Sequence, residues 1–283
     1  EIYPDLVHLG NGYSSMHEWM LACYLNGIKV LVHDHGTRYP CSFRTKLFVR
    51  FLDAIISVSD SYKNNAVKQR LKVKRIKRIY NGLNIEEYKN KTNSTDKNKL
   101  KCEFNIAEGQ LVVGIIGNII KWKGQHVVLQ AIREVKKFYP EIKCLIVGKV
   151  ALRSESYKQE LGNYIIDNNL KENIIFTRFR NDVPDILSLL DIMIHASIEP
   201  EPFGMVLLEA MAICKPIIAT NAGGPTEIIV NGETGILIPV NDYASMAEAI
   251  IYLLSNRETG KEMGEKGRQR LIEMFSKEKM VYE

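Results

Sequence analysis

From residue 111 onward, short apolar runs rich in β-branched residues alternate with longer segments of helical period. This pattern is typical of a parallel sheet covered by helices on both faces. Helices are expected at Gln125–Phe138 and at Asp242–Leu254, which Asp242 would cap. The expected strands are Leu111–Ile116, Ile142–Val147, Asn173–Phe176, Asp191–His195, Pro216–Thr220 and Gly235–Pro239. We therefore predict a doubly wound α/β domain.

The preceding residues repeat this pattern on a smaller scale. The expected strands are Asp5–Leu9, Lys29–His33, Ala54–Ser59 and Arg75–Tyr80, with helices around Met16–Leu25 and Phe43–Leu52. A complete Rossmann-like half carries further strands and a first strand-to-helix turn with a Gly-rich ligand loop. Neither precedes Pro4 in this sequence. We therefore expect the first domain to be incomplete and the chain to be N-terminally truncated.

A polar stretch without apolar period separates the two parts, and we interpret it as the interdomain linker. The predicted organisation is a first Rossmann-like domain over residues 1–85, a linker over 86–108, a second such domain over 109–265, and a C-terminal helix over 266–283 that returns toward the first domain. Ligands of open α/β sheets bind at the carboxyl ends of the strands, so a shared site is expected in a cleft between the domains.

Composition is that of a globular protein: 46% of the 283 residues are hydrophobic and 25% are charged. The longest uninterrupted run of apolar or Gly residues, Leu111–Gly117, is far shorter than the ~20 residues of a membrane-spanning helix, so we expect a soluble chain. The five cysteines are scattered and contain no Cys-x-x-Cys pair, which favours a reducing, cytoplasmic location.

Charge is concentrated in the first hundred residues, where 17 Lys and Arg stand against 9 Asp and Glu. The segment 61–80 contains eight basic residues and no acidic one: Lys63, Lys68, Arg70, Lys72, Lys74, Arg75, Lys77 and Arg78. Such a patch could contact an anionic membrane surface or a phosphate-bearing acceptor, or it could be a solvated helix face. No stacking aromatics are interleaved with these charges, so nucleic acid is not an expected partner.

The segment 199–212 is the most informative for function, because a helix is expected to open near Gly204. The free backbone N–H groups of a helix start form an anion site. Glu209 is the single charge between Phe203 and Ile213. A buried carboxylate needs a partner, and a vicinal diol such as a ribose could donate two hydrogen bonds to it.

Glu201 and Glu209, with seven residues between them that include Phe203–Gly204, closely resemble the signature of the retaining family 4 (group 1) glycosyltransferases of the GT-B fold. Further matches extend along the chain: Pro4–His8, Ser57–Ser59, Tyr80–Gly82, Lys123–Gly124, Leu145–Gly148, Phe179–Arg180, Asp182, Ala210–Ala212, Pro216–Thr220, Gly223–Pro225, Glu227 and Phe275–Glu278. The resemblance implies two Rossmann-like domains facing a cleft, the first on the acceptor side and the second binding a nucleotide sugar.

The resemblance also implies roles for individual residues. Glu209 would bind the donor ribose and Lys123 would neutralise the departing diphosphate, with the base beside Phe179 and Arg180. Glu201 would hold the transferred sugar and its phosphate together with Phe203, Gly204, Met205 and Val206. A His of the first domain would lie near the sugar; His35 is favoured over His33, because Gly36 lets a ligand approach the backbone.

Several positions depart from the family pattern. Asn118 follows Gly117 in the expected phosphate-binding turn, where the family commonly has Arg. Loss of that guanidinium weakens diphosphate binding unless Lys121 or Arg153 compensates. Arg178 stands where the family usually has Gly, beside the expected base pocket. There is no Asp-x-Asp pair, which agrees with a metal-independent enzyme without cofactor.

The leading interpretation is a retaining hexosyltransferase that moves a sugar from a UDP- or GDP-linked donor to a glycan, lipid-linked or small acceptor in polysaccharide or glycoconjugate synthesis. It would act in the cytoplasm, with possible attachment to the inner face of the membrane through residues 61–80. Two alternatives stay open: a sugar-nucleotide epimerase or phosphorylase of the same fold, and a non-catalytic nucleotide-sugar-binding protein.

Overall fold

The computed structural model describes residues 4–37, 40–91 and 97–283, and the chain forms two compact units. The first unit comprises the residues up to Asn81 together with Glu201–Gly204 and Met280–Glu283, and the second comprises Gly82–Pro200 and Met205–Lys279. These units are defined by packing, and the boundaries expected from the sequence stay a prediction. Within the described residues, no helix combines the length and the apolar character needed to cross a membrane.

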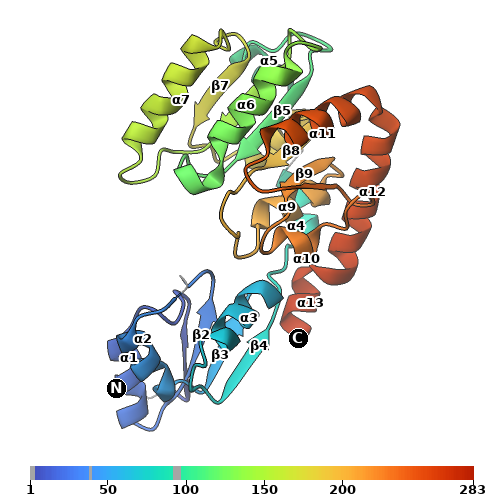
Figure 1. Cartoon of the computed structure of the whole chain (residues 1–283). Helices are drawn as coiled ribbons and strands as arrows, with labels where there is room; N and C mark the ends of the chain where they lie inside the picture. Colours follow the sequence, from blue (N-terminus) through green and yellow to red (C-terminus); the bar gives the residue numbers. More distant parts are fainter. Residues whose placement is uncertain (1–3, 38–39, 92–96) are drawn as a thin grey trace. The chain divides into compact units, whose positions relative to one another are not determined.

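The first unit is built on a parallel four-stranded sheet in the order β1-β2-β3-β4 (Figure 1). Its elements are β1 (Leu6–Leu9), α1 (His17–Leu25), β2 (Lys29–Asp34), α2 (Phe43–Phe48), η1 (Val49–Phe51), β3 (Ala54–Ser57), α3 (Asp60–Lys68) and β4 (Arg75–Arg78). The four predicted strands are confirmed. The core is formed by apolar side chains of β2, β3, α1 and α3, among them Val32, Ile55, Met20 and Ala66, all fully buried.

The second unit contains a parallel six-stranded sheet in the order β10-β9-β8-β5-β6-β7. Its strands are β5 (Val112–Ile116), β6 (Lys143–Val147), β7 (Ile174–Arg178), β8 (Ile192–His195), β9 (Ile217–Thr220) and β10 (Ile236–Ile238). Its helices are α4 (Ile85–Lys91), α5 (Lys97–Glu103), η2 (Lys121–Lys123), α6 (Gln125–Val135), α7 (Glu155–Asp167), α8 (Val183–Leu189), α9 (Met205–Ala212), α10 (Pro225–Ile228), α11 (Tyr243–Ser255) and α12 (Arg257–Met274); α13 (Lys277–Tyr282) follows. The predicted GT-B fold class, with a smaller first sheet, is confirmed.

Helices cover both faces of the six-stranded sheet, as its buried strands require. Helices α6, α7 and α11 lie beside the sheet (Figure 1). Alternate residues of the strands, such as Val113 and Ile115, pack in one core with these helices. The residues between them point to the other face, where α9 packs against α12 and α4 packs against α8 and α9. As expected, Asp242 caps α11 by accepting a hydrogen bond from the Ser245 N–H at 3.0 Å.

The polar stretch interpreted as a linker showed no helical pattern in the sequence, but in the structure it contains the short helices α4 and α5. Each helix is anchored by one apolar side chain, Tyr88 and Leu100 respectively, that is buried in the second unit. A helix that buries only one side chain shows no repeat of apolar residues every three or four positions, so the hydrophobic pattern did not predict either helix. Residues 92–96 of the expected linker lie outside the described residues.

Two glycines inside helices offer a matched test of this packing. A Cβ at Gly162 in α7 would meet nothing within 4 Å, whereas a Cβ at Gly264 in α12 would lie 2.0 Å from the carbonyl oxygen of Cys214. We expect Gly162→Ala to stabilise the protein by roughly 0.5–1 kcal/mol through helix propensity. Gly264→Ala should instead lower the free energy of unfolding by about 1–3 kcal/mol, because the backbone must move. Urea unfolding measures both, and equal shifts would contradict the close approach of α12.

Candidate functional site

The candidate site lies in the second unit, where the order of the strands reverses. The chain runs from β5 through β6 to β7 on one side, then returns to β8, which pairs with the other side of β5. The loops that follow β5 and β8 therefore diverge at the carboxyl edge of the sheet. Open α/β sheets bind their ligands in the crevice formed by such a reversal.

Three glycines bring the backbone segments of this edge into direct contact. A Cβ at Gly148, which follows β6, would lie 2.1 Å from the carbonyl oxygen of Gly117, which follows β5. A Cβ at Gly124, just after η2, would lie 1.9 Å from the carbonyl oxygen of Ala196, which follows β8. Gly117, Gly124 and Gly148 all have positive φ angles, of 152°, 72° and 147°. Only glycine permits this close packing.

Lys123 is held at the reversal by these contacts. Its aliphatic carbons lie 3.9 Å from the position of a Cβ on Gly117, so the side chain extends over the turn that follows β5. Its ammonium lies 4.2 Å from the ring centroid of Trp122, a cation–π arrangement. The neighbouring Asn118 is exposed, and its carbonyl oxygen accepts a 2.9 Å hydrogen bond from the buried Gln125 amide. The structure thus places Gly117, Asn118 and Lys123 together at this turn, and their contact with a phosphate stays a prediction.

Helix α9 presents Glu209 and begins at Met205 and Val206, whose N–H groups belong to its first, unpaired turn. The Tyr88 hydroxyl of α4 donates a hydrogen bond to Glu209 Oε2 at 3.4 Å. Burial raises the pKa of Glu209 to about 7, and the Tyr88 hydrogen bond acts in the opposite direction. Glu209 therefore changes charge near neutral pH, and an additional hydrogen-bond donor would favour its ionised form.

Phe179 and Arg180 follow β7, and the structure gives them different surroundings. The Phe179 ring is 62% exposed. The Arg180 guanidinium forms ion pairs with Glu103 and with Asp182, the latter at 2.6 Å, and these hydrogen bonds raise its pKa. Arg178 has a left-handed φ of 63°. The Arg180 head group is thus held by carboxylates, and contact of this segment with a base stays a prediction.

The remaining predicted residues belong to the first unit. His33 lies near the end of β2 and His35 just after it; their rings are 4.2 Å apart, and burial lowers the pKa of both, that of His33 to about 4. Both imidazoles are therefore neutral at pH 7. The buried Asp34 fixes this turn by accepting hydrogen bonds from the Thr37 N–H at 2.8 Å and the Thr37 hydroxyl at 2.6 Å.

Glu201, Phe203 and Gly204 are also grouped with the first unit. Glu201 and Phe203 are buried, and the Phe203 ring lies 5.9 Å from that of Tyr80. A Cβ at Gly36, beside His35, would lie 2.8 Å from the ring of Pro202. The structure thus brings the His35 turn and the Glu201–Gly204 segment together.

Comparison with known families matches both parts of the chain. Residues 96–270 match the family described as "Glycosyl transferases group 1", and residues 1–87 match "Glycosyltransferase Family 4". The chain belongs to the group 1 glycosyltransferases.

Individual group 1 relatives add detail. N-acetyl-alpha-D-glucosaminyl L-malate synthase of Bacillus anthracis is 31% identical over 229 residues, which are 81% of this chain and 57% of the relative. The capsular polysaccharide biosynthesis glycosyltransferase CapM of Staphylococcus aureus is 27% identical over 228 residues, 78% of this chain and 57% of the relative. The chain thus spans somewhat over half the length of these relatives.

A solved group 1-like structure matches almost the whole chain. The crystal structure of HepE from Anabaena in complex with UDP-glucose superposes with a TM-score of 0.86 at 25% identity, covering 98% of this chain and 76% of the other. This similarity extends through both sheets.

Sequence reasoning missed two residues that contact predicted site residues. Tyr88 and Glu103 lie in the stretch expected as linker, 121 and 77 residues from their partners Glu209 and Arg180. Spacing along the chain carries no signal for such distant contacts. The one available hint was the buried charge of Glu209, which required a polar partner.

The raised pKa of Glu209 predicts a pH-dependent stability. Between its ordinary value of 4.5 and about 7, the folded protein holds a proton that the unfolded chain has released. The stability contributed by this group is therefore present at pH 4.5 and is lost as the pH rises to 7. We expect wild type to lose stability relative to Glu209→Gln over this interval, measured by urea unfolding at pH 5, 6, 7 and 8.

The comparison with Glu209→Gln is needed because buried histidines such as His33 also titrate. Their pKa values are lowered, so their contribution to stability increases as the pH rises, opposite to that of Glu209. In Tyr88→Phe the pKa of Glu209 should rise further, so the loss of stability should extend to higher pH. If the free energy of unfolding changes with pH in the same way in wild type and Glu209→Gln, the burial of this carboxylate is contradicted.

Proposed function

We propose that this group 1 glycosyltransferase transfers a sugar, with retention of configuration, from a UDP-linked donor to a glycan, lipid-linked or small acceptor. The observation that carries the proposal is the arrangement at the reversal of the six-stranded sheet: Lys123 over the Gly117 turn and Glu209 on α9. The similarity to a structure bound to UDP-glucose supports uridine as the base.

The chemistry required of this edge is the binding and release of a nucleoside diphosphate. A diphosphate gains negative charge as the bond to the sugar breaks, and a compact ammonium at Lys123 stabilises that charge. The unpaired N–H groups that begin α9, at Met205 and Val206, provide a second anion-binding element. Glu209, once ionised, accepts two hydrogen bonds from the vicinal hydroxyls of a ribose.

Retention follows if the acceptor attacks on the face that the diphosphate leaves, with a donor phosphate oxygen taking the acceptor proton. No protein nucleophile is then needed. In this proposal Glu201, with Phe203 and Gly204, holds the transferred sugar, and the neutral His35 donates a hydrogen bond to one of its hydroxyls. Phe179 and Arg180 border the base.

The acceptor class is proposed from the relatives' names. CapM is named for capsular polysaccharide biosynthesis and the Bacillus anthracis relative for a malate product, which supports either a glycan or a small acceptor. We propose a cell-surface polysaccharide or glycoconjugate as the product of the present protein, made in the cytoplasm.

A second candidate function is nucleotide-sugar binding without transfer, and Asn118 favours it. This residue stands where the resemblance implies Arg, and its side chain is exposed. An amide lacks the charge and the fork of a guanidinium, so stabilisation of the leaving group would rest on Lys123. If this second function is correct, the protein binds the nucleotide sugar but does not transfer the sugar to an acceptor.

Isothermal titration with UDP, GDP and ADP tests the proposed donor. We expect UDP to bind most tightly, and Lys123→Ala to weaken UDP binding by roughly 10- to 100-fold, the value of one or two charge-assisted hydrogen bonds. Glu209→Gln should weaken UDP but leave inorganic pyrophosphate unchanged, because Glu209 contacts only the ribose.

The matched control for Lys123→Ala is Lys266→Ala, an exposed lysine of α12, which should bind UDP like wild type. Preference for another nucleotide would refute the uridine assignment. Transfer is then assayed with UDP-glucose and a panel of acceptors: an α-linked product supports the retaining transferase, whereas binding without any turnover selects the second candidate.

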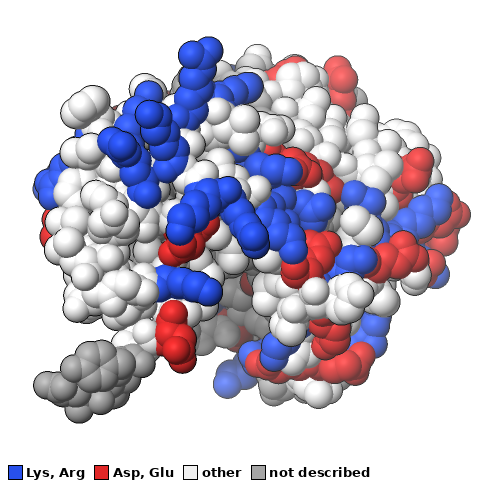
Figure 2. Space-filling view, turned by 90° about the horizontal axis from the view of Figure 1, so that it is seen from below, with Lys and Arg blue, Asp and Glu red and all other residues white. Residues whose placement is uncertain are grey.

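The basic residues of the first unit support the proposal of membrane attachment. Lys63, Lys74 and Arg78 form ion pairs with Asp60 or Asp53. Lys68, Lys72 and Arg75 form none with the described part of the chain, and Lys72 and Arg75 lie in or beside the edge strand β4. In the face shown in Figure 2, basic side chains gather with few acidic ones over part of the surface. We propose that they contact anionic lipid headgroups.

Sedimentation with vesicles containing anionic lipid tests this attachment. We expect binding at low salt that is lost at high salt, because screening shortens the reach of exposed charges. The triple variant Lys68→Glu, Lys72→Glu and Arg75→Glu should remain in the supernatant. A variant with Lys261→Glu and Lys266→Glu on α12 is the control, and equal sedimentation of the two variants would rule out the proposed surface.

A further inference from the structure

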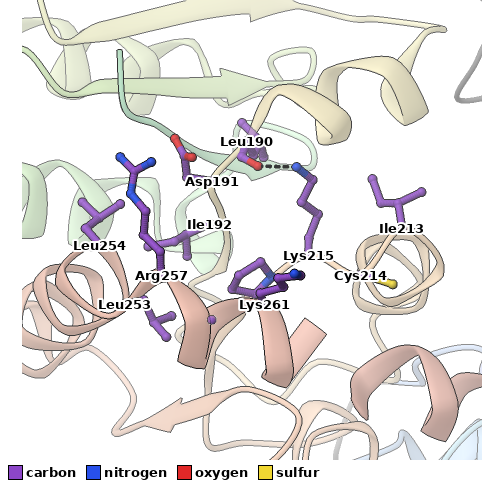
Figure 3. A pocket seen from close by; sticks show the side chains of 12 residues that line it. Leu190, Asp191, Ile192, Ile213, Cys214, Lys215, Leu253, Leu254, Arg257 and Lys261 are labelled. Atoms are coloured by element: carbon purple, nitrogen blue, oxygen red, sulfur yellow. Dashed lines mark hydrogen bonds between the residues drawn. The ribbon is translucent and has the colours of Figure 1, made fainter. Parts of the chain in front are cut away.

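A pocket of about 220 Å³ lies at the amino edge of the six-stranded sheet, opposite the edge that carries Lys123 (Figure 3). It is bounded by the residues that precede β8 and β9, by the end of α9, by the end of α11 and by the first turns of α12. All of these elements belong to the second unit. The proposed donor site uses none of the residues that line this pocket.

Three basic side chains line the pocket against a single acid. Arg257 and Lys261 are four residues apart on α12, so they lie on one face of the helix, and Lys215 reaches in from the turn before β9 (Figure 3). Asp191 is the one acidic residue of the lining, and its Oδ2 accepts a hydrogen bond from the Val112 N–H at 2.7 Å. The lining therefore carries a formal charge of two positive units.

The basic groups are available to a ligand to different degrees. Neither Arg257 nor Lys261 forms an ion pair or a hydrogen bond through its side chain with the described residues. The Lys215 ammonium donates to the carbonyl oxygens of Ser188 at 2.8 Å and Leu190 at 2.6 Å, which leaves one N–H for a further acceptor. Burial, with the charge of Lys97 nearby, lowers the pKa of Lys215 to about 8, so it is still mostly charged at pH 7.

The start of α12 adds to this positive character. Asn256 precedes the 18-residue helix without accepting a side-chain hydrogen bond from its first turn. The helix dipole therefore places partial positive charge beside Arg257. The rest of the lining is apolar and includes Leu253, Leu254 and Ile213. The pocket thus combines a cationic rim with an apolar wall.

We propose that this pocket binds a small phosphomonoester with a compact apolar body. A phosphomonoester carries about two negative charges at neutral pH, which balance the two positive charges of the lining. A carboxylate carries one negative charge and would leave positive charge uncompensated. Arg257 binds two phosphate oxygens through its fork, and Lys261 and Lys215 donate to the third. The apolar body lies against Leu253 and Leu254. The volume suits a small metabolite.

Phenyl phosphate is the test ligand, and its binding is measured by titration calorimetry against inorganic phosphate and phenol. We expect phenyl phosphate to bind more tightly than either, because only it uses both the charged rim and the apolar wall. The double variant Arg257→Gln, Lys261→Gln should lose at least about tenfold in affinity. Both side chains are exposed, so the variant should fold, which its unfolding midpoint will show.

Two control variants separate this pocket from the proposed donor site. Lys266→Gln, on another face of α12, and Lys123→Ala should bind phenyl phosphate like wild type, while Lys123→Ala weakens UDP. The proposal is overturned if phenyl phosphate does not bind, if the double variant binds it unchanged, or if Lys123→Ala abolishes its binding. Failure of UDP to bind would refute the donor assignment alone and leave this result intact.

Discussion

The close backbone packing around the turn that follows β5 determines where Lys123, the cation of the proposed donor edge, lies. Gly148 and Gly124 let neighbouring loops approach the Gly117 and Ala196 carbonyls at distances that no side chain would allow. Because η2 is fixed by these contacts at its end, Lys123 is held over the Gly117 turn. A larger residue at either glycine would displace the backbone, and with it the cation that the proposed reaction requires.

A second constraint is the burial of Glu209. A carboxylate in this setting is costly when ionised, and the Tyr88 hydroxyl offsets only part of that cost. At neutral pH the Glu209 carboxyl is therefore near the middle of its titration, and hydroxyl donors would favour its ionised form. Binding of a ribose would then be coupled to release of a proton. The amino edge shows the opposite arrangement: Arg257 and Lys261 are exposed, and three basic side chains face the single acid Asp191, which suits a dianion rather than a diol.

The sequence predicted the sheets well, because buried parallel strands read as short β-branched runs and helices such as α11 begin at recognisable caps like Asp242. It also brought together Gly117, Asn118 and Lys123, which lie within seven residues of one another. It did not predict α4 and α5, whose burial depends on the single side chains Tyr88 and Leu100. Nor did it show that Arg180 is held by Glu103, or that Lys215, Arg257 and Lys261 share a pocket. Those groupings arise from tertiary contacts between residues far apart in the chain.

The central claim is that the carboxyl edge of the six-stranded sheet binds the nucleoside diphosphate part of the donor, and a crystal structure of the protein with UDP tests it most directly. The account predicts diphosphate oxygens within hydrogen-bond distance of Lys123 Nζ and of the N–H groups that begin α9, with both ribose hydroxyls donating to Glu209 and the Tyr88 hydroxyl still in contact. UDP bound elsewhere, or bound with its ribose away from Glu209, would contradict it.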